Sequence, residues 1–313
     1  MSILSPARRS AVDRTTPRRP RLRGDMRDLP LAIAFILPAT IGFGVFLVWP
    51  SIRGIWLSFT DYSVFQPGKF IGLENYRRMF VDPVFWASMR TTVYYVVVNI
   101  AVQTLVALLL AVLLSRLTKS MVMRGIILTP YLVSNVVTAL LWLLLLDYQL
   151  GIVNELLDWV GIGRQSFWGN PTLVVPTIAM VNVWRHVGYT ALLIFAGLQS
   201  IPPQLYEAAS IDGASKWQIF WDVIVPLSRP GLITLAIFAF LGNYGGLIWP
   251  LVMVKSEYLR TLPVGMMFFD TQYGRQTNLI MAGSVLAVIP PLILFIAGQK
   301  FLVKGIQLGA VKG

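Results

Sequence analysis

Cysteine is absent from this chain of 313 residues, and histidine occurs once, as His186. The lack of cysteine excludes disulfides, thiol catalysis and cysteine-based zinc or iron–sulfur sites, and a lone His186 leaves no histidine-rich metal site. Charged residues are also scarce, at 13% of the chain against 56% for hydrophobic residues. A soluble domain is about a quarter charged, so this composition indicates a chain that is surrounded by lipid.

Three further absences narrow the functional class. The sequence has no G-x-x-x-x-G-K-[ST] motif, so the chain cannot hydrolyse ATP by itself. It has no cluster of His, Asp and Glu that could serve a membrane enzyme. Acidic residues stand at the ends of apolar runs, as Asp147 and Asp270 do, rather than within them. This disfavours an ion-coupled secondary transporter of small polar solutes, which nevertheless stays open as the alternative.

Six apolar runs dominate the rest of the chain. Each has about 20 residues or more, enough at about 1.5 Å per residue to cross about 30 Å of hydrocarbon as a helix. They predict an all-α membrane protein in which residues 29–313 form one six-helix transmembrane domain. The predicted spans are 29–50, 89–115, 121–146, 172–198, 231–254 and 281–303.

The distribution of positive charge predicts the orientation. Eight arginines lie in residues 1–28, directly before the first apolar run, and we expect this segment to be a disordered basic cytoplasmic tail. With the N-terminus inside, the internal segments hold 16 Lys and Arg and the external ones 8. The positive-inside rule therefore predicts that both termini are cytoplasmic. It also explains the net charge of +12 better than nucleic-acid binding does.

The cytoplasmic loop at 201–230 has strong local signals. Pro202 and Pro203 can begin a short helix, and Gly213 can end it in the left-handed conformation. Ser215 and Gln218 have the spacing of a capping box at the start of a second helix. On that helix an apolar face is predicted, and Pro226 and Pro230 are expected to stop the helix before the next span. The residues of the predicted apolar face are Trp217, Phe220, Trp221 and Ile224. These signals predict a compact helix–turn–helix, suited either to docking in a partner or to lying on the headgroups.

This loop resembles the EAA loop of binding-protein-dependent ABC importer permeases. The triplet Glu207-Ala208-Ala209 is followed four residues later by a Gly, in Asp212-Gly213-Ala214. Further on, Val223, Val225 and Pro226 resemble the I-x-L-P at the end of the family's motif. The segments Phe70–Tyr76 and Leu198–Pro202 resemble the sugar-permease branch, of the maltose or glycerol-3-phosphate type. The resemblance covers nearly the whole chain. Residues 309–313, however, are similar to the end of the second of the two paired permease types, so the slot that this chain fills stays open.

The resemblance implies a type I ABC importer permease fold and a set of partners. The chain would sit in the inner or plasma membrane of a prokaryote, contact membrane lipid and form half of a translocation path. A dimer of ATPase subunits would use ATP and Mg²⁺, and this chain would bind no cofactor. A second, different permease and an external solute-binding protein would complete the complex. The residues implied in coupling to the ATPase are Glu207, Ala208, Ala209, Asp212, Gly213, Ala214, Phe220 and Pro226.

Polar residues within the predicted spans are candidates for the solute path, because polar groups are costly in hydrocarbon unless they are partnered or functional. The run Gly242–Gly246 interrupts the fifth span, where glycine permits an opened backbone. Aromatic rings beside amides would suit a sugar. Interhelical hydrogen bonding is the alternative role for each of these residues. The candidates are Tyr131, Asn135, Asn182, Trp184, Asn243 and Tyr244. Arg185 has no identifiable partner in the sequence and would favour a phosphate-bearing solute.

Overall fold

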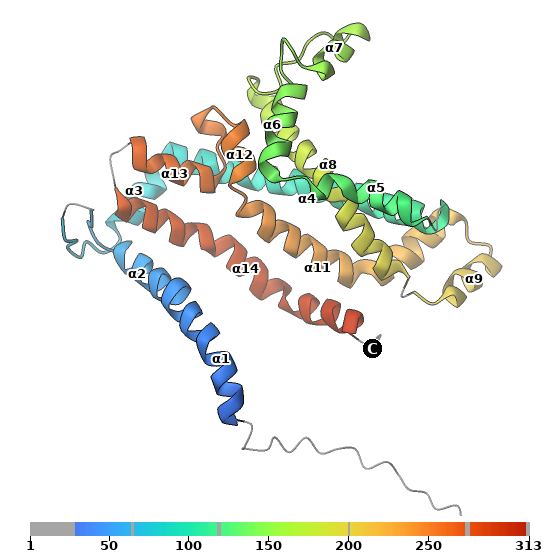
Figure 1. Cartoon of the computed structure of the whole chain (residues 1–313), viewed down its shortest axis with the longest axis horizontal. Helices are drawn as coiled ribbons and strands as arrows, with labels where there is room; N and C mark the ends of the chain where they lie inside the picture. Colours follow the sequence, from blue (N-terminus) through green and yellow to red (C-terminus); the bar gives the residue numbers. More distant parts are fainter. Residues whose placement is uncertain (1–28, 64–65, 118–119, 200, 273–275, 311–313) are drawn as a thin grey trace, which may run out of the picture. The chain divides into compact units, whose positions relative to one another are not determined.

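The computed structural model describes residues 29–63, 66–117, 120–199, 201–272 and 276–310, without the side chains of 116–117, 269–272 and 302–310. Within these ranges the regular structure is helical, apart from two isolated β-bridges, Thr60–Phe70 and Ser63–Gln66 (Figure 1). The predicted disordered tail, 1–28, lies outside the described residues. The all-α fold that the composition predicted is confirmed.

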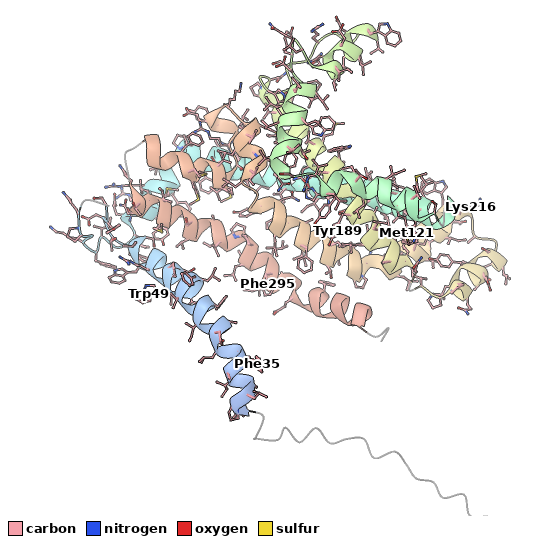
Figure 2. The ribbon with its side chains drawn as sticks, in the orientation of Figure 1. Phe35, Trp49, Met121, Tyr189, Lys216 and Phe295 are labelled. Carbon is pink, nitrogen blue, oxygen red and sulfur yellow. The ribbon has the colours of Figure 1, made fainter. Side chains whose placement is uncertain are left out.

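The chain divides into two compact units, Met1–Arg53 and Gly54–Gly313. The first unit contains the beginning of the first span, which runs from Leu29 to Leu57 as α1 (Leu29–Phe43), a π-helical turn (Gly44–Val48) and α2 (Trp49–Leu57). Its large apolar side chains, Phe35 and Trp49 among them, are exposed (Figure 2). The length and apolar character of this helix are typical of a membrane span.

The second unit contains the remaining spans. The uninterrupted ones are α4 (Pro83–Leu117), α8 (Pro171–Leu198), the helix Lys216–Tyr244 that ends in α11 (Val225–Tyr244), and α14 (Thr277–Ala310). Within the described residues, they and the first span make five helices that are long and apolar enough to cross a membrane, or six if a bent pair is counted as one span. The shorter elements are α3 (Glu74–Val81), α7 (Ile152–Trp159), α9 (Pro203–Ile211), α10 (Lys216–Gln218), α12 (Ile248–Met253) and α13 (Leu262–Gln272).

The third predicted span, 121–146, is not one helix. It consists of α5 (Met121–Leu132) and α6 (Asn135–Leu145), which meet at an angle of 89°. Val133 and Ser134 between them have extended backbone, with ψ of 139° and 142°. Pro130 lacks an N–H group, which weakens the last turn of α5 just before the break. The predicted third span is therefore a bent pair of helices rather than a single helix.

The fifth predicted span, 231–254, also needs correction. Its helix runs continuously from Lys216 to Tyr244, so Pro226 and Pro230 do not stop it. A wider π-helical turn at Ile219–Ile224 precedes Pro226, and such a turn can accommodate a residue that breaks the α-helical hydrogen-bond ladder. The predicted interruption at Gly242–Gly246 is confirmed, because α11 ends at Tyr244 and the short α12 follows.

Helices α4 and α8 form the centre of the second unit. Small residues at their contact, Ala107 and Ala191, are both completely buried and allow the backbones to approach, as is common between helices in membranes. One apolar cluster surrounds Val175 and Tyr244, and a second one surrounds Leu198. The second cluster includes buried side chains from the loop that joins α8 to α11, namely Ile201, Phe220 and Ile224.

Candidate functional site

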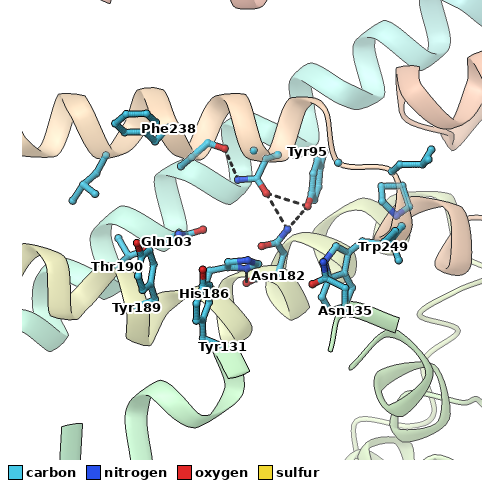
Figure 3. A pocket seen from close by; sticks show the side chains of 18 of the residues that line it. Tyr95, Gln103, Tyr131, Asn135, Asn182, His186, Tyr189, Thr190, Phe238 and Trp249 are labelled. Carbon is cyan, nitrogen blue, oxygen red and sulfur yellow. Dashed lines mark hydrogen bonds between the residues drawn. The ribbon is translucent and has the colours of Figure 1, made fainter. Parts of the chain in front are cut away.

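A cavity of about 390 Å³ lies among α4, α8 and α11, where both interrupted spans have their breaks (Figure 3). The end of α5 and the start of α6 form one wall, and the break after α11 forms another. Its lining contains both aromatic and amide side chains. The lining residues with polar side chains or rings are Tyr95, Gln103, Tyr131, Asn135, Asn182, His186, Tyr189, Thr190, Phe238, Asn243 and Trp249.

A network of side-chain hydrogen bonds joins α4, α8 and α11 beside the cavity. The Asn182 Nδ2 group donates to the Tyr95 hydroxyl at 2.6 Å and to Asn243 Oδ1 at 2.9 Å. The Asn243 Nδ2 group donates to Asn99 Oδ1 at 3.0 Å. Figure 3 shows the Asn182 amide nitrogen directed toward Tyr95. These bonds hold the Asn182 amide through its nitrogen, whereas its oxygen is not part of the network.

Three amide oxygens of the lining accept no hydrogen bond from the residues that the structure describes: Gln103 Oε1, Asn135 Oδ1 and Asn182 Oδ1. The side chains of Gln103 and Asn182 are only 6% and 4% exposed, and leaving such an acceptor unpaired costs about 1–3 kcal/mol. The Gln103 Nε2 group is already engaged, since it donates to Thr190 Oγ1 at 2.8 Å. Each of these oxygens is thus an acceptor without a donor among the described residues.

Aromatic rings supply the apolar part of the cavity. Tyr131 stacks on Tyr189, with ring centroids 4.5 Å apart and planes at 8°, and it meets His186 edge-on at 5.7 Å. Trp249 on α12 also lines the cavity and is 5% exposed. Flat apolar faces beside hydrogen-bonding amides match a ring that has C–H faces and hydroxyl edges.

The charged groups near the cavity are not available for ion coupling. No lining residue among those described is acidic. Arg185 donates to backbone carbonyls of α5 and the break, so its partner is the peptide backbone rather than a carboxylate. Just after α6, the N–H groups of Leu150 and Gln149 donate to Asp147 and hold its pKa below the usual value. Asp147 therefore stays ionised and organises a loop.

The structure brings together four of the six side chains that the sequence suggested for a solute path: Tyr131, Asn135, Asn182 and Asn243. The other two, Trp184 and Tyr244, lie outside this lining. Trp184 packs edge-on against Trp142, with centroids 5.3 Å apart. Tyr244 is 5% exposed and stacks on Phe240, with its hydroxyl 4.0 Å from Met89 Sδ. Consecutive residues of a helix point in different directions, so neighbours of a lining residue need not line the same cavity.

Sequence reasoning missed the contribution of α4. Tyr95, Asn99 and Gln103 are spaced four residues apart, which places them on one face of a helix. This polar stripe within an apolar run was a readable signal. Tyr189 and Thr190 were also missed, although they follow Asn182 and His186 on the same helix. Tyr189 and Thr190 can be recognised as lining residues only when the helices packed against α8 are known.

The loop between α8 and α11 has the predicted local geometry. Gly213 has φ of +78°, the left-handed conformation. The Ala214 N–H donates to Ala209 O at 3.0 Å, and the Gly213 N–H donates to Ser210 O at 3.2 Å. These two bonds form a Schellman motif, which satisfies the last carbonyls of α9. The sequence predicted both the end of this helix and the residue that ends it.

The second half of the loop is confirmed in one respect and corrected in another. The capping box is present: the Ser215 N–H donates to Gln218 Oε1 at 2.7 Å, and the Gln218 N–H donates to Ser215 Oγ at 3.3 Å. The four apolar residues do not act as one face, because Phe220 is buried whereas Trp217 and Trp221 are 67% and 57% exposed. Phe220 and Ile224 pack into the cluster of α4 and α8, which leaves the tryptophans outside.

The loop thus has a buried side that anchors it and an exposed side. The exposed side contains acidic groups, Glu207 and Asp212, together with Ala208. Ile211 is 85% exposed at the end of α9. Ala209 and Ala214 are half-buried, and Pro226 is exposed. A rigid loop with an exposed apolar surface is suited to docking in a groove of a partner.

Comparison with known proteins agrees with this architecture. The family described as "Binding-protein-dependent transport system inner membrane component" matches residues 79–307. The chain is 36% identical over 210 residues to a probable ABC transporter permease protein of Pyrococcus horikoshii, covering 66% of this chain and 72% of that protein. It is 35% identical over 209 residues to a trehalose/maltose transport system permease protein of Thermococcus litoralis, covering 66% and 71%.

A solved structure shares the fold. A chain in the crystal structure of a bacterial alginate ABC transporter, in complex with an alginate pentasaccharide-bound periplasmic protein, has a TM-score of 0.77 and 22% sequence identity. The alignment covers 89% of this chain and 96% of that chain. The apolar helices, the loop between α8 and α11 and these relatives lead to one family. This multi-pass membrane protein belongs to the inner membrane components of binding-protein-dependent transport systems, which are ABC importers and not ion-coupled secondary transporters.

Proposed function

We propose that this chain forms half of the translocation path for a sugar or sugar-like solute and that the cavity among α4, α8 and α11 binds that solute. The observation that carries the proposal is the set of three buried amide oxygens without a donor, on Gln103, Asn135 and Asn182. They lie beside the stacked rings of Tyr131 and Tyr189. Hydroxyl groups of a sugar would donate to the oxygens while its C–H faces pack on the rings.

The chemistry of the lining favours a neutral solute. No described lining residue is acidic, so the cavity offers no carboxylate for a cation. A glycerol-phosphate ester would need cationic donors, and the guanidinium of Arg185 is occupied by backbone carbonyls. A di- or oligosaccharide is therefore the better supported of the two solute classes. The similarity to a trehalose/maltose permease supports the same class.

The loop between α8 and α11 would couple the spans to an ATPase dimer, which uses ATP and Mg²⁺. Support comes from its rigid turn, its buried anchor and its exposed apolar surface. A second permease, in a hetero-pair, would supply the other half of the path, and an external solute-binding protein would deliver the solute. The residues that we assign to coupling are Glu207, Ala208, Ala209, Asp212, Gly213, Ala214, Phe220 and Pro226.

Substitution of an unpaired amide tests the solute site. Asn135→Ala removes an acceptor that bonds to no described residue, so we expect the complex to assemble normally. Loss of one hydrogen bond to the solute should raise the KM of uptake about tenfold, which corresponds to about 1.4 kcal/mol. Uptake by proteoliposomes would be measured with labelled maltose, trehalose, glycerol 3-phosphate and a dipeptide.

The control for this test is Tyr244→Phe, which removes a hydroxyl outside the cavity and should leave the KM unchanged. Wild-type uptake of the dipeptide alone, together with normal kinetics for Asn135→Ala, would contradict both the site and the solute class.

The orientation of the chain can be tested by labelling, because the chain has no native cysteine. Ser210 and Ser166 are exposed residues of the loop after α8 and the loop before it. The excess of positive charge predicts that Ser210 lies inside the cell and Ser166 outside. Ser166→Cys should react with an impermeant thiol reagent in intact cells, whereas Ser210→Cys should react only after permeabilisation. Labelling of Ser210→Cys from outside would reverse the orientation.

A further inference from the structure

The break between α5 and α6 exposes carbonyl groups at the end of α5. Two residues of extended backbone follow Leu132, so the last carbonyls of α5 have no helical partners further along the chain. A helix C-terminus has a partial negative charge and attracts cations. Unpaired carbonyls are costly within a membrane. A bend of 89° at this position therefore needs donors from another part of the protein.

Arg185 on α8 supplies those donors. Its Nη2 donates to Tyr131 O at 3.1 Å and to Val133 O at 2.8 Å, and its Nε donates to Val133 O at 3.2 Å. Its Nη1 contacts His186 Nε2 at 3.0 Å. A guanidinium has five N–H groups in a planar fork, and four of them are used in these contacts. Arg185 thus acts as a cap for α5 that comes from a neighbouring helix.

His186 completes the arrangement in one tautomer. Its Nδ1 lies 2.9 Å from Asn182 O, and a backbone carbonyl can only accept, so Nδ1 carries the proton. Nε2 then has the lone pair that accepts from Arg185. The ring of His186 also packs edge-on against Tyr131, whose ring lies 5.4 Å from the Arg185 guanidinium carbon. Arg185 and His186 thus hold both the backbone and the ring of Tyr131, and Tyr189 stacks on the same ring.

The segment that Arg185 caps also lines the cavity. Tyr131 is the last lining residue of α5, and Asn135 is the first residue of α6, two positions beyond Val133. We propose that Arg185 is a positioning residue, which fixes the bend between α5 and α6 so that Tyr131 and Asn135 face the solute. This inference rests on the proposed role of the cavity. It assigns Arg185 to solute affinity although Arg185 does not itself contact the solute.

Two other roles fit the geometry less well. A phosphate ligand would need at least two free N–H groups in the fork, and the contacts with described residues leave only one. A general contact between α5 and α8 would not need the backbone carbonyls of the break. Such a contact exists elsewhere: Arg124 on α5 lies over the Phe195 ring of α8 at 4.5 Å. Arg124 does not line the cavity, so it provides a matched control.

The first measurement follows the bend directly. Val122 on α5 and Leu141 on α6 are exposed. This chain has no native cysteine, so both can be replaced by spin-labelled cysteine and studied in a complex whose other subunits have had any cysteines replaced. We expect one narrow distance distribution between the labels. Arg185→Lys keeps the charge but loses the fork, so the distribution should broaden. Arg124→Lys should leave it narrow.

The second measurement is uptake of the sugar that the wild-type complex transports best. Arg185→Lys should raise the KM about tenfold, equivalent to about 1.4 kcal/mol, with Vmax and basal ATPase activity kept. If Arg185 had only a structural role, Arg185→Lys would lower the amount of complex and Vmax together. In that case Arg124→Lys would have the same effect. An unchanged distribution, an unchanged KM or an equal effect of Arg124→Lys would each overturn the proposal. If Asn135→Ala has no effect while Arg185→Lys broadens the distribution, the solute site is wrong and Arg185 is only a structural cap.

Discussion

Gly188→Ala is expected to prevent assembly of a transporting complex. Gly188 is buried on α8, and a Cβ atom at this position would lie 2.0 Å from Ile127 O and 2.8 Å from Ile127 C. Both are backbone atoms of α5, so no change of side-chain rotamer relieves the overlap. The two helices would have to separate. We expect this to cost more than the usual penalty for overpacking, which is about 1–3 kcal/mol. The amount of folded complex after extraction should fall severalfold, and uptake should be lost.

A matched substitution on the same helix separates this clash from the effect of alanine itself. An added Cβ at Gly197 meets nothing within 4 Å, and alanine in a helix is favoured over glycine by about 1 kcal/mol. Gly197→Ala should therefore assemble and transport at least as well as the wild type. Size-exclusion profiles and uptake would be compared for the two variants. Normal assembly of Gly188→Ala would mean that α5 and α8 do not approach closely in the complex.

The sequence predicted the spans because each signal is local. The apolar runs indicate membrane helices by length alone, and the turn at Gly213 follows from the conformations open to glycine. The capping box at Ser215 and Gln218 is a relation between residues of one turn. Each of these features is present in the structure. A prediction of this kind needs no knowledge of which helices are neighbours.

The break at Val133 and Ser134 is different in origin. Pro130 and the polar pair Ser134 and Asn135 lie near it, but membrane helices tolerate such residues, so they do not predict a bend. It is stabilised by Arg185, which is about 50 residues away in the chain and contacts the freed carbonyls. The sequence showed Arg185 as an unexplained charge and 121–146 as an ordinary span. The two observations explain each other only when α8 is placed against α5.

The candidate site was recognisable in part for the same reason. Polar side chains in apolar runs are conspicuous, so their positions in the predicted spans indicated Asn135, Asn182 and Asn243. Their hydrogen bonds to Tyr95 and Asn99 depend on tertiary packing of α4. The direction of each side chain also depends on packing, which is why Tyr244 seemed a site residue and lies in the core instead.

The cavity and the loop share their supporting helices. Asn182 and Arg185 lie on α8, which leads into the loop, and Asn243 lies on α11, which follows it. Buried Phe220 and Ile224 attach the loop to α4 and α8. A force on the loop would therefore act on both helices that flank the proposed solute site. This arrangement predicts that a distorted loop impairs transport even when the cavity is intact.

Gly213→Val should uncouple ATP hydrolysis from transport. Left-handed backbone costs an L-residue about 1–2 kcal/mol, and a β-branched side chain tolerates it least. Nothing lies within 4 Å of a Cβ at this position, so the effect would come from the backbone turn alone. The Schellman bonds that end α9 would be strained and the exposed side of the loop displaced. We expect normal amounts of the chain in the membrane, with uptake reduced more than tenfold and loss of the ATPase stimulation by solute.

Gly161 is the matched control, because it has φ of +81° with open space around it, in the loop between α7 and α8. Gly161→Val introduces the same backbone strain at a position distant in sequence from the loop between α8 and α11. It should therefore leave the ATPase stimulation unchanged. Gly213→Asn should restore much of the uptake, since asparagine adopts left-handed backbone more readily than valine. Recovery with asparagine would identify the turn itself as the element that transmits coupling. If Gly161→Val and Gly213→Val lost uptake and ATPase stimulation equally, general instability would explain the effect. If Gly213→Val transported normally, this turn would have no role in coupling.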